Sequence, residues 1–417
     1  MIFFGDKWSD MTNEVSLDKI AHIQQGQYLS PKEMAMFPNK EAAIPVWGAN
    51  GIIGFTNKAS YEKSVPLVTC RGNGCGLVQW TKGPAHISNN AMTILPKSGS
   101  ESDNRYLYYT LLNSDFSDVT TGSAQPQITV GHLKRKVVYW GEPPEYRRTI
   151  AHILGTLDDK IELNRRMNET LEAMAQALFK SWFVDFDPVR AKMEGRPTGL
   201  PKEIEDLFPD SFEDSELGEI PRGWKASPFD QLITEVNEKV GGRHVPEYSS
   251  TNNGLQLRSE RFKKNLSISI SNNKIIRRGC LIFGLSRQVL NFGLMRNEIG
   301  CISPAYKVFS INETMVEPDF VERVMRLKPN YYFGAVSASS REGQSISAEG
   351  LKRLKFVLPY KPLQTIFYEI TAPIQNHLLF LQKEAETLIQ IRDFLLPKLL
   401  SGEIRVTHLE KILEQTL

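Results

Sequence analysis

The sequence lacks the features that mark several large classes of protein. It contains no apolar run of about eighteen residues, so it predicts no membrane-spanning helix. Only 4 of its 417 residues are cysteine and none forms a CxxC pair, which favours a reducing cytoplasm over a disulfide scaffold. The N-terminal MIFFGDKWSD has a short apolar run and no basic segment before it, so we expect no secretory signal.

Motifs of catalysis are also missing. The 7 histidines include no HExxH pair, and no Walker loop is present, which argues against a zinc hydrolase and an ATP motor. The string Glu142-Pro143-Pro144-Glu145 lacks the polar first and aromatic fourth residues of an amino-methyltransferase motif. The glycine-rich run 71–76 precedes a strand-like LVQW rather than a helix, so it predicts a hairpin instead of a phosphate-binding loop. The sequence therefore predicts no catalytic residue, no cofactor-binding residue and no metal ligand.

Charge is distributed unevenly along a chain that is too long for one ordinary domain. The net charge is +2, yet residues 222–361 hold 22 Lys and Arg against 12 Asp and Glu. Residues 191–221 hold 3 basic against 9 acidic residues. A strongly basic block favours a polyanionic partner, although a well-solvated surface explains it about equally well.

Two long helices are predicted from a hydrophobic period of 3.5 residues. The first opens after Pro143-Pro144 and covers about forty residues, or roughly 60 Å of helix. The second opens at Pro362, should kink or break at Pro373, and stops near Gly402. Eight of ten seam positions are apolar in each: Ile150, Leu154, Leu157, Ile161, Asn164, Asn168, Leu171, Ala175, Leu178 and Trp182, then Phe367, Thr371, Ile374, Leu378, Leu381, Ala385, Leu388, Arg392, Leu395 and Leu399.

Two asparagines interrupt the first seam. A buried polar seam residue usually fixes helix register at some cost in stability, which is one interpretation of Asn164 and Asn168. In the other, the seam rotates locally and Met167 packs inward instead. The sequence leaves both interpretations open.

An internal duplication underlies this pattern. The string Ile128-Thr129-x3-Leu-Lys-Arg recurs as Ile346-Ser347-x3-Leu-Lys-Arg about 217 residues later, and Trp8 and Trp224 are separated by nearly the same distance. We therefore expect a mixed α/β domain followed by a long helix, used twice. The predicted parts are a globular domain (1–143), a helix (144–187), an extended Pro- and Gly-rich acidic linker over the surface (188–221), a basic globular domain (222–361), a helix (362–403) and a tail (404–417).

Both globular parts contain residue types that read DNA bases. Arginine and lysine suit guanine, and asparagine and glutamine suit adenine. For any single residue a solvated surface role is at least as plausible, whereas the LKR pairs before each helix suit phosphate contact. The candidates are Arg71, Asn73, Gln79, Asn89, Asn90, Gln125, Gln127, Lys134 and Arg135 in the first half, and Arg258, Arg261, Lys263, Lys264, Arg277, Arg278, Arg287, Gln288, Asn291, Arg341, Gln344, Lys352 and Arg353 in the second.

The chain resembles the specificity subunit of type I restriction-modification systems. The strings that carry the resemblance are RRTIAHILGTLDDKIELNRRMNETLEAMAQALFKSWFVDFDPVRAKMEG (147–195), LGEIPRGW (217–224) and LLPKLLSGEIRV (395–406). Family-like segments also occur at Ala49–Phe55 and Gly122–Thr129. The resemblance covers the whole chain, and its central and C-terminal strings are the most specific part.

The resemblance implies a fold and a set of partners. Two target recognition domains would read the two parts of a split, asymmetric DNA sequence, and two antiparallel coiled-coil helices would hold them at a set separation. The chain would be non-catalytic and would join two modification subunits that use S-adenosylmethionine, and restriction subunits that use ATP and Mg. Two alternatives stay open at this point: a stand-alone DNA methyltransferase or nuclease, and a purely architectural coiled-coil protein.

Overall fold

Two compact units make up the chain. A computed structural model describes residues 12–72, 74–122, 125–251, 254–261, 270–284, 291–328, 331, 336–339, 343–346 and 348–404. The first unit is Met1–Met167 with Phe380–Leu417, and the second is Asn168–Leu379. Both boundaries fall inside long helices, so each unit contains one globular part and half of each helix.

The first unit is built on a four-stranded sheet of order β2-β8-β5-β6, a three-stranded sheet of order β4-β3-β7 and the pair β1-β9. Its elements are β1 (Thr12–Ser16), α1 (Leu17–Ile20), β2 (Ala21–Gln25), η1 (Pro31–Glu33), β3 (Ile44–Gly48), β4 (Gly51–Thr56), β5 (Pro66–Thr69), β6 (Val78–Trp80), β7 (His86–Ile87), β8 (Ala91–Pro96), α2 (Glu101–Leu112), η2 (Ser117–Val119), α3 (Val130–Arg135) and β9 (Val137–Gly141). The long helix α4 (Pro144–Phe183) follows.

The second unit repeats this plan. Its globular elements are α5 (Asp187–Met193), α6 (Lys202–Glu205), β10 (Phe212–Ser215), β11 (Gly218–Pro221), β12 (Lys225–Pro228), η3 (Phe229–Gln231), β13 (Ile233–Glu235), β14 (Tyr248–Thr251), β15 (Gly254–Leu257), α7 (Arg258–Arg261), β16 (Lys274–Arg277), β17 (Leu281–Phe283), β18 (Phe292–Leu294), β19 (Ile299–Ile302), β20 (Lys307–Ile311), α8 (Pro318–Leu327), β21 (Val336–Ser339), β22 (Gly343–Ile346), α10 (Ala348–Arg353) and β23 (Lys355–Leu358). The long helix α11 (Lys361–Leu400) follows.

The predicted duplication is confirmed by topology. The sheet β13-β20-β17-β18 has the same strand order as β2-β8-β5-β6, and the pair β12-β23 matches β1-β9. Helices α4 and α11 each span 40 residues, and their first residues, Pro144 and Lys361, are separated by the repeat distance found in the sequence. The glycine-rich run after β5 forms a hairpin to β6, as the sequence predicts. The fold is therefore a mixed α/β domain followed by a long helix, present twice.

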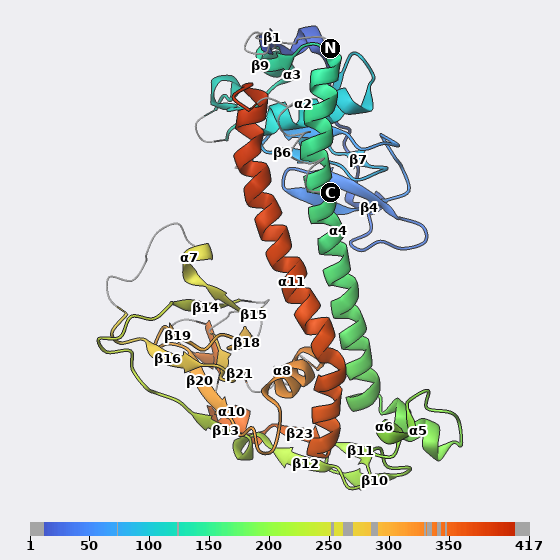
Figure 1. Cartoon of the computed structure of the whole chain (residues 1–417), viewed down its shortest axis with the longest axis vertical. Helices are drawn as coiled ribbons and strands as arrows, with labels where there is room; N and C mark the ends of the chain where they lie inside the picture. The colour runs from blue at the N-terminus through green and yellow to red at the C-terminus, as the bar shows by residue number, and fades with distance from the viewer. Residues whose placement is uncertain are drawn as a thin grey trace, which may run out of the picture. The chain divides into compact units, whose positions relative to one another are not determined.

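In the first unit, the start of α4 runs antiparallel to the end of α11 (Figure 1). The Tyr146 hydroxyl donates to the backbone oxygen of Leu399 at 2.7 Å. Further along α4, Asp158 accepts from Arg392 at 2.8 Å. Residue numbers therefore rise on one helix as they fall on the other. The core of this unit accordingly contains Leu396, Leu399 and Leu400 of α11.

The asparagine at the centre of the seam points inward. Asn164 is fully buried, and its amide nitrogen donates to Glu384 of α11 at 2.6 Å. Lys160 pairs with the same carboxylate at 3.3 Å. This contact supports the register interpretation, because only one alignment of the helices brings Asn164 to Glu384.

In the second unit, the end of α4 packs on the start of α11 through aromatic rings. The ring of Phe367 lies 5.4 Å from Phe179, 5.5 Å from Trp182 and 5.1 Å from Phe183. Edge-to-face rings at these distances attract beyond their buried area. All twenty seam positions predicted from the sequence are buried or half-buried.

Polar contacts fix the globular part of the first unit to its helices. The Tyr109 hydroxyl of α2 donates to Asp158 at 2.7 Å, and Arg105 pairs with Asp159 at 2.6 Å. Glu162 accepts from Lys82, which follows β6, and from Arg165 on its own helix. Arg165, together with Lys82, lowers the pKa of Glu162 from its ordinary value.

The expected break at Pro373 is absent. Helix α11 is continuous from Lys361 to Leu400, although Pro373 removes one backbone donor. Pro373 is exposed, whereas Thr371 and Leu381 on either side are buried at 0% and 2% exposure. Burial of the flanking seam residues holds the helix together through the proline.

The segment 188–221 was expected to be an extended linker, and this expectation is wrong. It forms α5, α6 and the β10-β11 hairpin. Val189, Phe208 and Ile220 are buried, and the first two belong to the core of the second unit. The Phe208 ring meets Trp182 of α4 at 5.2 Å. A few apolar residues thus anchor a segment whose overall composition is polar and proline-rich.

Replacing Leu399 with alanine should destabilise the first unit, because Leu399 is fully buried in its core. We expect a loss of about 2–5 kcal/mol in the free energy of unfolding. Leu379→Ala on the same helix removes a side chain that is 56% exposed and should cost less than about 0.5 kcal/mol. Denaturant unfolding, monitored by hydrogen exchange, measures the free energy of unfolding of each unit separately. Equal effects of the two changes would contradict the assignment of α11 to the first core.

The Glu162 contacts predict a specific pH dependence. Because the folded-state pKa lies below the ordinary 4.5, the carboxylate stabilises the fold at neutral pH, and this contribution disappears as pH falls below that value. When the pH is lowered from neutral to acid, the free energy of unfolding of Glu162→Gln should therefore fall less than that of the natural chain. The difference should be up to about 1 kcal/mol. Glu172→Gln, an exposed position of α4, is the matched control. Urea unfolding across a pH series is the measurement, and superimposable profiles would exclude the effect.

Candidate nucleic-acid interface

Two loops of the first unit lie side by side at one end of the β2-β8-β5-β6 sheet. One is the turn after β5, and the other is the segment that precedes α3. The Gly72 amide donates to the Pro126 oxygen at 3.1 Å, and the Ile128 amide donates to the Cys70 oxygen at 3.0 Å. Arg71 and Gln127 face each other as an isolated bridge. The fold therefore joins segments that are far apart in sequence.

The segment before α3 is itself a narrow hairpin. Thr121 and Gln127 exchange two backbone hydrogen bonds, at 2.9 and 2.7 Å. Thr129 then caps α3 by accepting from the His132 amide at 3.2 Å. These contacts fix the backbone on which Gln125 and Gln127 stand.

Three side chains on these loops are available to a partner. Arg71, Gln125 and Gln127 are exposed, and none makes a side-chain hydrogen bond to another described residue. Their guanidinium and amide groups can form the paired hydrogen bonds that base edges require. Lys134 and Arg135 of α3 are exposed as well and suit phosphate oxygens.

The other candidates of the first half occupy different environments. Asn89 and Asn90 are partly exposed between β7 and β8, and the Asn90 oxygen accepts from the Cys70 amide at 2.9 Å, so they adjoin the same loops. The Gln79 amide instead donates to the backbone oxygens of Gly48 and Ala49, at 3.3 and 3.4 Å. Asn73 lies outside the described residues.

Sequence reasoning missed two exposed residues beside these loops. Gln25 donates to the Asn89 oxygen at 3.0 Å. Asn50 stands in the turn between β3 and β4, next to Gly74. The Asn50-Gly51 dipeptide between two apolar runs is a hairpin signal. That signal predicts the turn but does not show that it meets the Arg71 loop.

The second unit repeats the hairpin. Ala338 of β21 pairs with Gln344 of β22, and these two residues follow Thr121 and Gln127 at the repeat distance of the sequence. Arg287 corresponds in the same way to Arg71, within one position, but it lies outside the described part of the chain. Gln288, Arg341, Lys263 and Lys264 also lie outside it, and Arg261 and Lys352 are described only as positions in α7 and α10.

Several cations of the basic block are already paired. Arg258 meets Glu247 at 2.8 Å, Arg277 meets Glu238 at 3.1 Å, and Arg278 meets Glu298 at 2.8 Å. The last two pairs are exposed and therefore weak, so a polyanion can compete for these arginines. Arg353 is exposed at the end of α10, and Asn291 is half-buried before β18.

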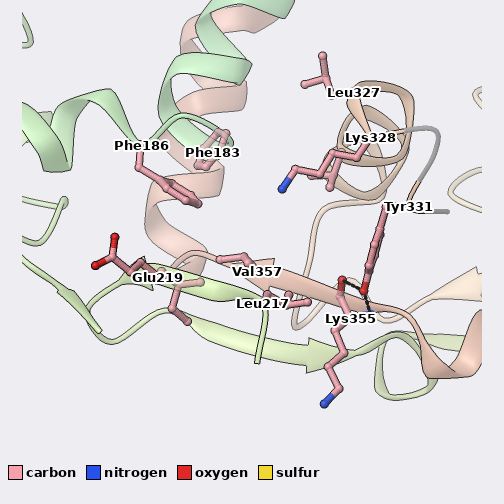
Figure 2. A pocket seen from close by; sticks show the side chains of 11 residues that line it. Phe183, Phe186, Leu217, Glu219, Leu327, Lys328, Tyr331, Lys355 and Val357 are labelled. Carbon is pink, nitrogen blue, oxygen red and sulfur yellow. Dashed lines mark hydrogen bonds between the residues drawn. The ribbon is translucent and has the colours of Figure 1, made fainter. Parts of the chain in front are cut away.

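A cavity of about 380 Å³ lies elsewhere in the second unit. Figure 2 shows Phe183 and Phe186 on one side, Lys328 and Tyr331 on the other, and Val357 below. The Tyr331 hydroxyl accepts from the backbone amide of Lys355 at 3.1 Å. The lining combines apolar side chains with the Glu219 carboxylate and the ammonium groups of Lys328 and Lys355.

Comparison with known proteins shows which family the chain is similar to. The family model described as "Type I restriction modification DNA specificity domain" matches residues 9–173. The MjaIX specificity subunit of Methanocaldococcus jannaschii is 26% identical, with 92% of this chain and 87% of that protein covered. The HindI specificity subunit of Haemophilus influenzae is 26% identical, with 76% and 79% covered. The crystal structure of a type I S subunit from M. genitalium has the same fold, with a TM-score of 0.60 at 13% identity over 95% of this chain and 98% of that one.

Residues 9–173 thus match a DNA specificity domain of type I restriction-modification systems, and the chain is similar to specificity subunits of such systems over most of its length. The expectation of a non-catalytic DNA-recognition subunit is thereby confirmed, because the matching domain is a DNA specificity domain. Among the described residues, no helix is both long and apolar enough to cross a membrane.

Proposed function

We propose that each unit reads one part of a split, asymmetric DNA target, and that the hairpin before α3 or α10 carries the reading side chains. The observation that carries this proposal is the repeat of the hairpin pair, Thr121 with Gln127 and Ala338 with Gln344. Two equivalent hairpins in one chain suit the two half-sites of a split target. Because the hairpins carry different side chains, they suit different bases.

We further propose the partners that the family resemblance implies. Two modification subunits methylate adenine with S-adenosylmethionine, and restriction subunits translocate and cut DNA with ATP and Mg. The paired helices α4 and α11 set the spacing between the half-sites, and the complex works in the cytoplasm. The chain itself contributes recognition and assembly.

A methylome tests the function directly. In a strain that carries this chain and its modification subunit, sequencing should find methylated adenine in a motif of two unlike half-sites separated by unspecified bases. Deleting the gene for this chain should remove that motif and no other. A motif that persists after the deletion, or one without a gap, would refute the proposal.

The first-unit interface predicts the effect of single substitutions on DNA binding. Arg71→Ala and Gln127→Ala should each weaken binding of the methyltransferase complex to its target by about 5- to 150-fold, because each removes a paired base contact. Binding to unrelated DNA should change much less. Arg222→Ala, an exposed arginine of the second unit outside the candidate set, removes the same charge as a control. Equal losses on specific and unrelated DNA would reassign Arg71 to phosphate contact.

A further inference from the structure

The turn between β3 and β4 is packed against the loop that carries Arg71. A Cβ on Gly74 would lie 2.6 Å from Oδ1 of Asn50 and 3.5 Å from the Ala49 oxygen, so the two turns touch. The Thr69 hydroxyl, at the end of β5, donates to the Ala49 oxygen at 2.6 Å. Any partner that reaches Arg71 therefore also meets this turn.

The turn is held rigidly. The Gln79 amide donates to Gly48, to Ala49 and to the Thr69 hydroxyl, the last at 3.2 Å. Gly51 adopts a φ of +105°, which side chains other than glycine rarely allow. Gln79 is thus a positioning residue, and the loop it fixes is set before any ligand arrives.

The turn presents two exposed isoleucines and an amide that has no hydrogen-bond partner among the described residues. Asn50 is exposed, and its amide makes no hydrogen bond within the described part of the chain. Ile52 is 50% exposed. Ile53 is 48% exposed too, but its Cγ2 lies over Gly48, 2.7 Å from where a Cβ would stand. The turn therefore presents an apolar side chain and an exposed amide two residues apart.

We propose that Asn50 and Ile52 read an A·T base pair within the half-site taken by the first unit. Adenine presents N7 as acceptor and the N6 amino group as donor, which match the amide of asparagine. The thymine of the same pair presents its methyl group, which matches isoleucine. A G·C pair offers neither combination, so the two side chains together discriminate against it. This assignment rests on the proposed DNA interface, because it places the turn beside Arg71.

The test uses modified targets bound by the methyltransferase complex. Deoxyuridine replaces each thymine of the first half-site in turn, which removes only the methyl group. 7-Deazaadenine replaces each adenine, which removes only N7. At one base pair, both replacements should weaken binding by the natural complex: about fourfold for the methyl group, as for one buried methyl, and about 5- to 150-fold for N7.

Variants assign each effect to its residue. Ile52→Ala should bind thymine and deoxyuridine targets equally, and Asn50→Ala should bind adenine and 7-deazaadenine targets equally. Ile53→Ala and Asn113→Ala, exposed positions of the same unit, should keep the full effects. The A·T assignment is wrong if every replacement weakens DNA binding equally in the natural complex and in the Asn50→Ala and Ile52→Ala complexes. It is also wrong if no replacement weakens DNA binding in any of these complexes. An Arg71→Ala complex is measured in parallel. If the proposed DNA interface itself is wrong, Arg71→Ala causes no loss of DNA binding; if only the A·T assignment is wrong, Arg71→Ala still weakens DNA binding.

Discussion

The pairing of half of one long helix with half of the other is the constraint on which both units depend. In the first unit, Leu399 of α11 completes a core whose other members come from the start of the chain. In the second, Phe367 of α11 packs on Phe179 of α4. Each unit therefore needs both helices, and the first unit cannot be cut from the sequence as one continuous stretch. A change that replaces the candidate DNA-contacting surface of one unit must therefore leave intact the halves of α4 and α11 that belong to that unit.

This pairing also explains where polar groups are tolerated in the seam. A buried asparagine costs stability unless its amide finds a partner. Asn164 has Glu384, and Asp158 has both Tyr109 of the globular part and Arg392 of the second helix. The Asp158 carboxylate consequently ties three elements together in one alignment. Such contacts give the helices a defined register, which apolar residues of similar size would specify less strictly.

Patterns that repeat over many residues were predictable from the sequence. The hydrophobic period indicated both long helices, and the internal repeat predicted the duplicated sheet order that the strands then show. The folding of 188–221 was not predictable from composition, because buried apolar residues such as Val189 and Phe208 outweigh many prolines and acids. The continuous helix at Pro373 depends on packing on both sides of the proline. Neither effect can be deduced from the local secondary-structure propensities of the residues.

For the candidate interface, residue type was predictable and position was not. Arg71, Gln79 and Gln127 are equally plausible base readers in sequence, yet the Gln79 amide is consumed by the turn at Gly48 and Ala49. Asn50, which sequence reasoning passed over, makes no side-chain hydrogen bond to a described residue and lies on the turn that Gln79 holds. Whether a polar side chain can read a base depends on which of its hydrogen bonds the protein has already used, and only tertiary structure answers that. Because the exposed candidate residues contribute little to the cores, their identity can change while the buried contacts that support them stay the same.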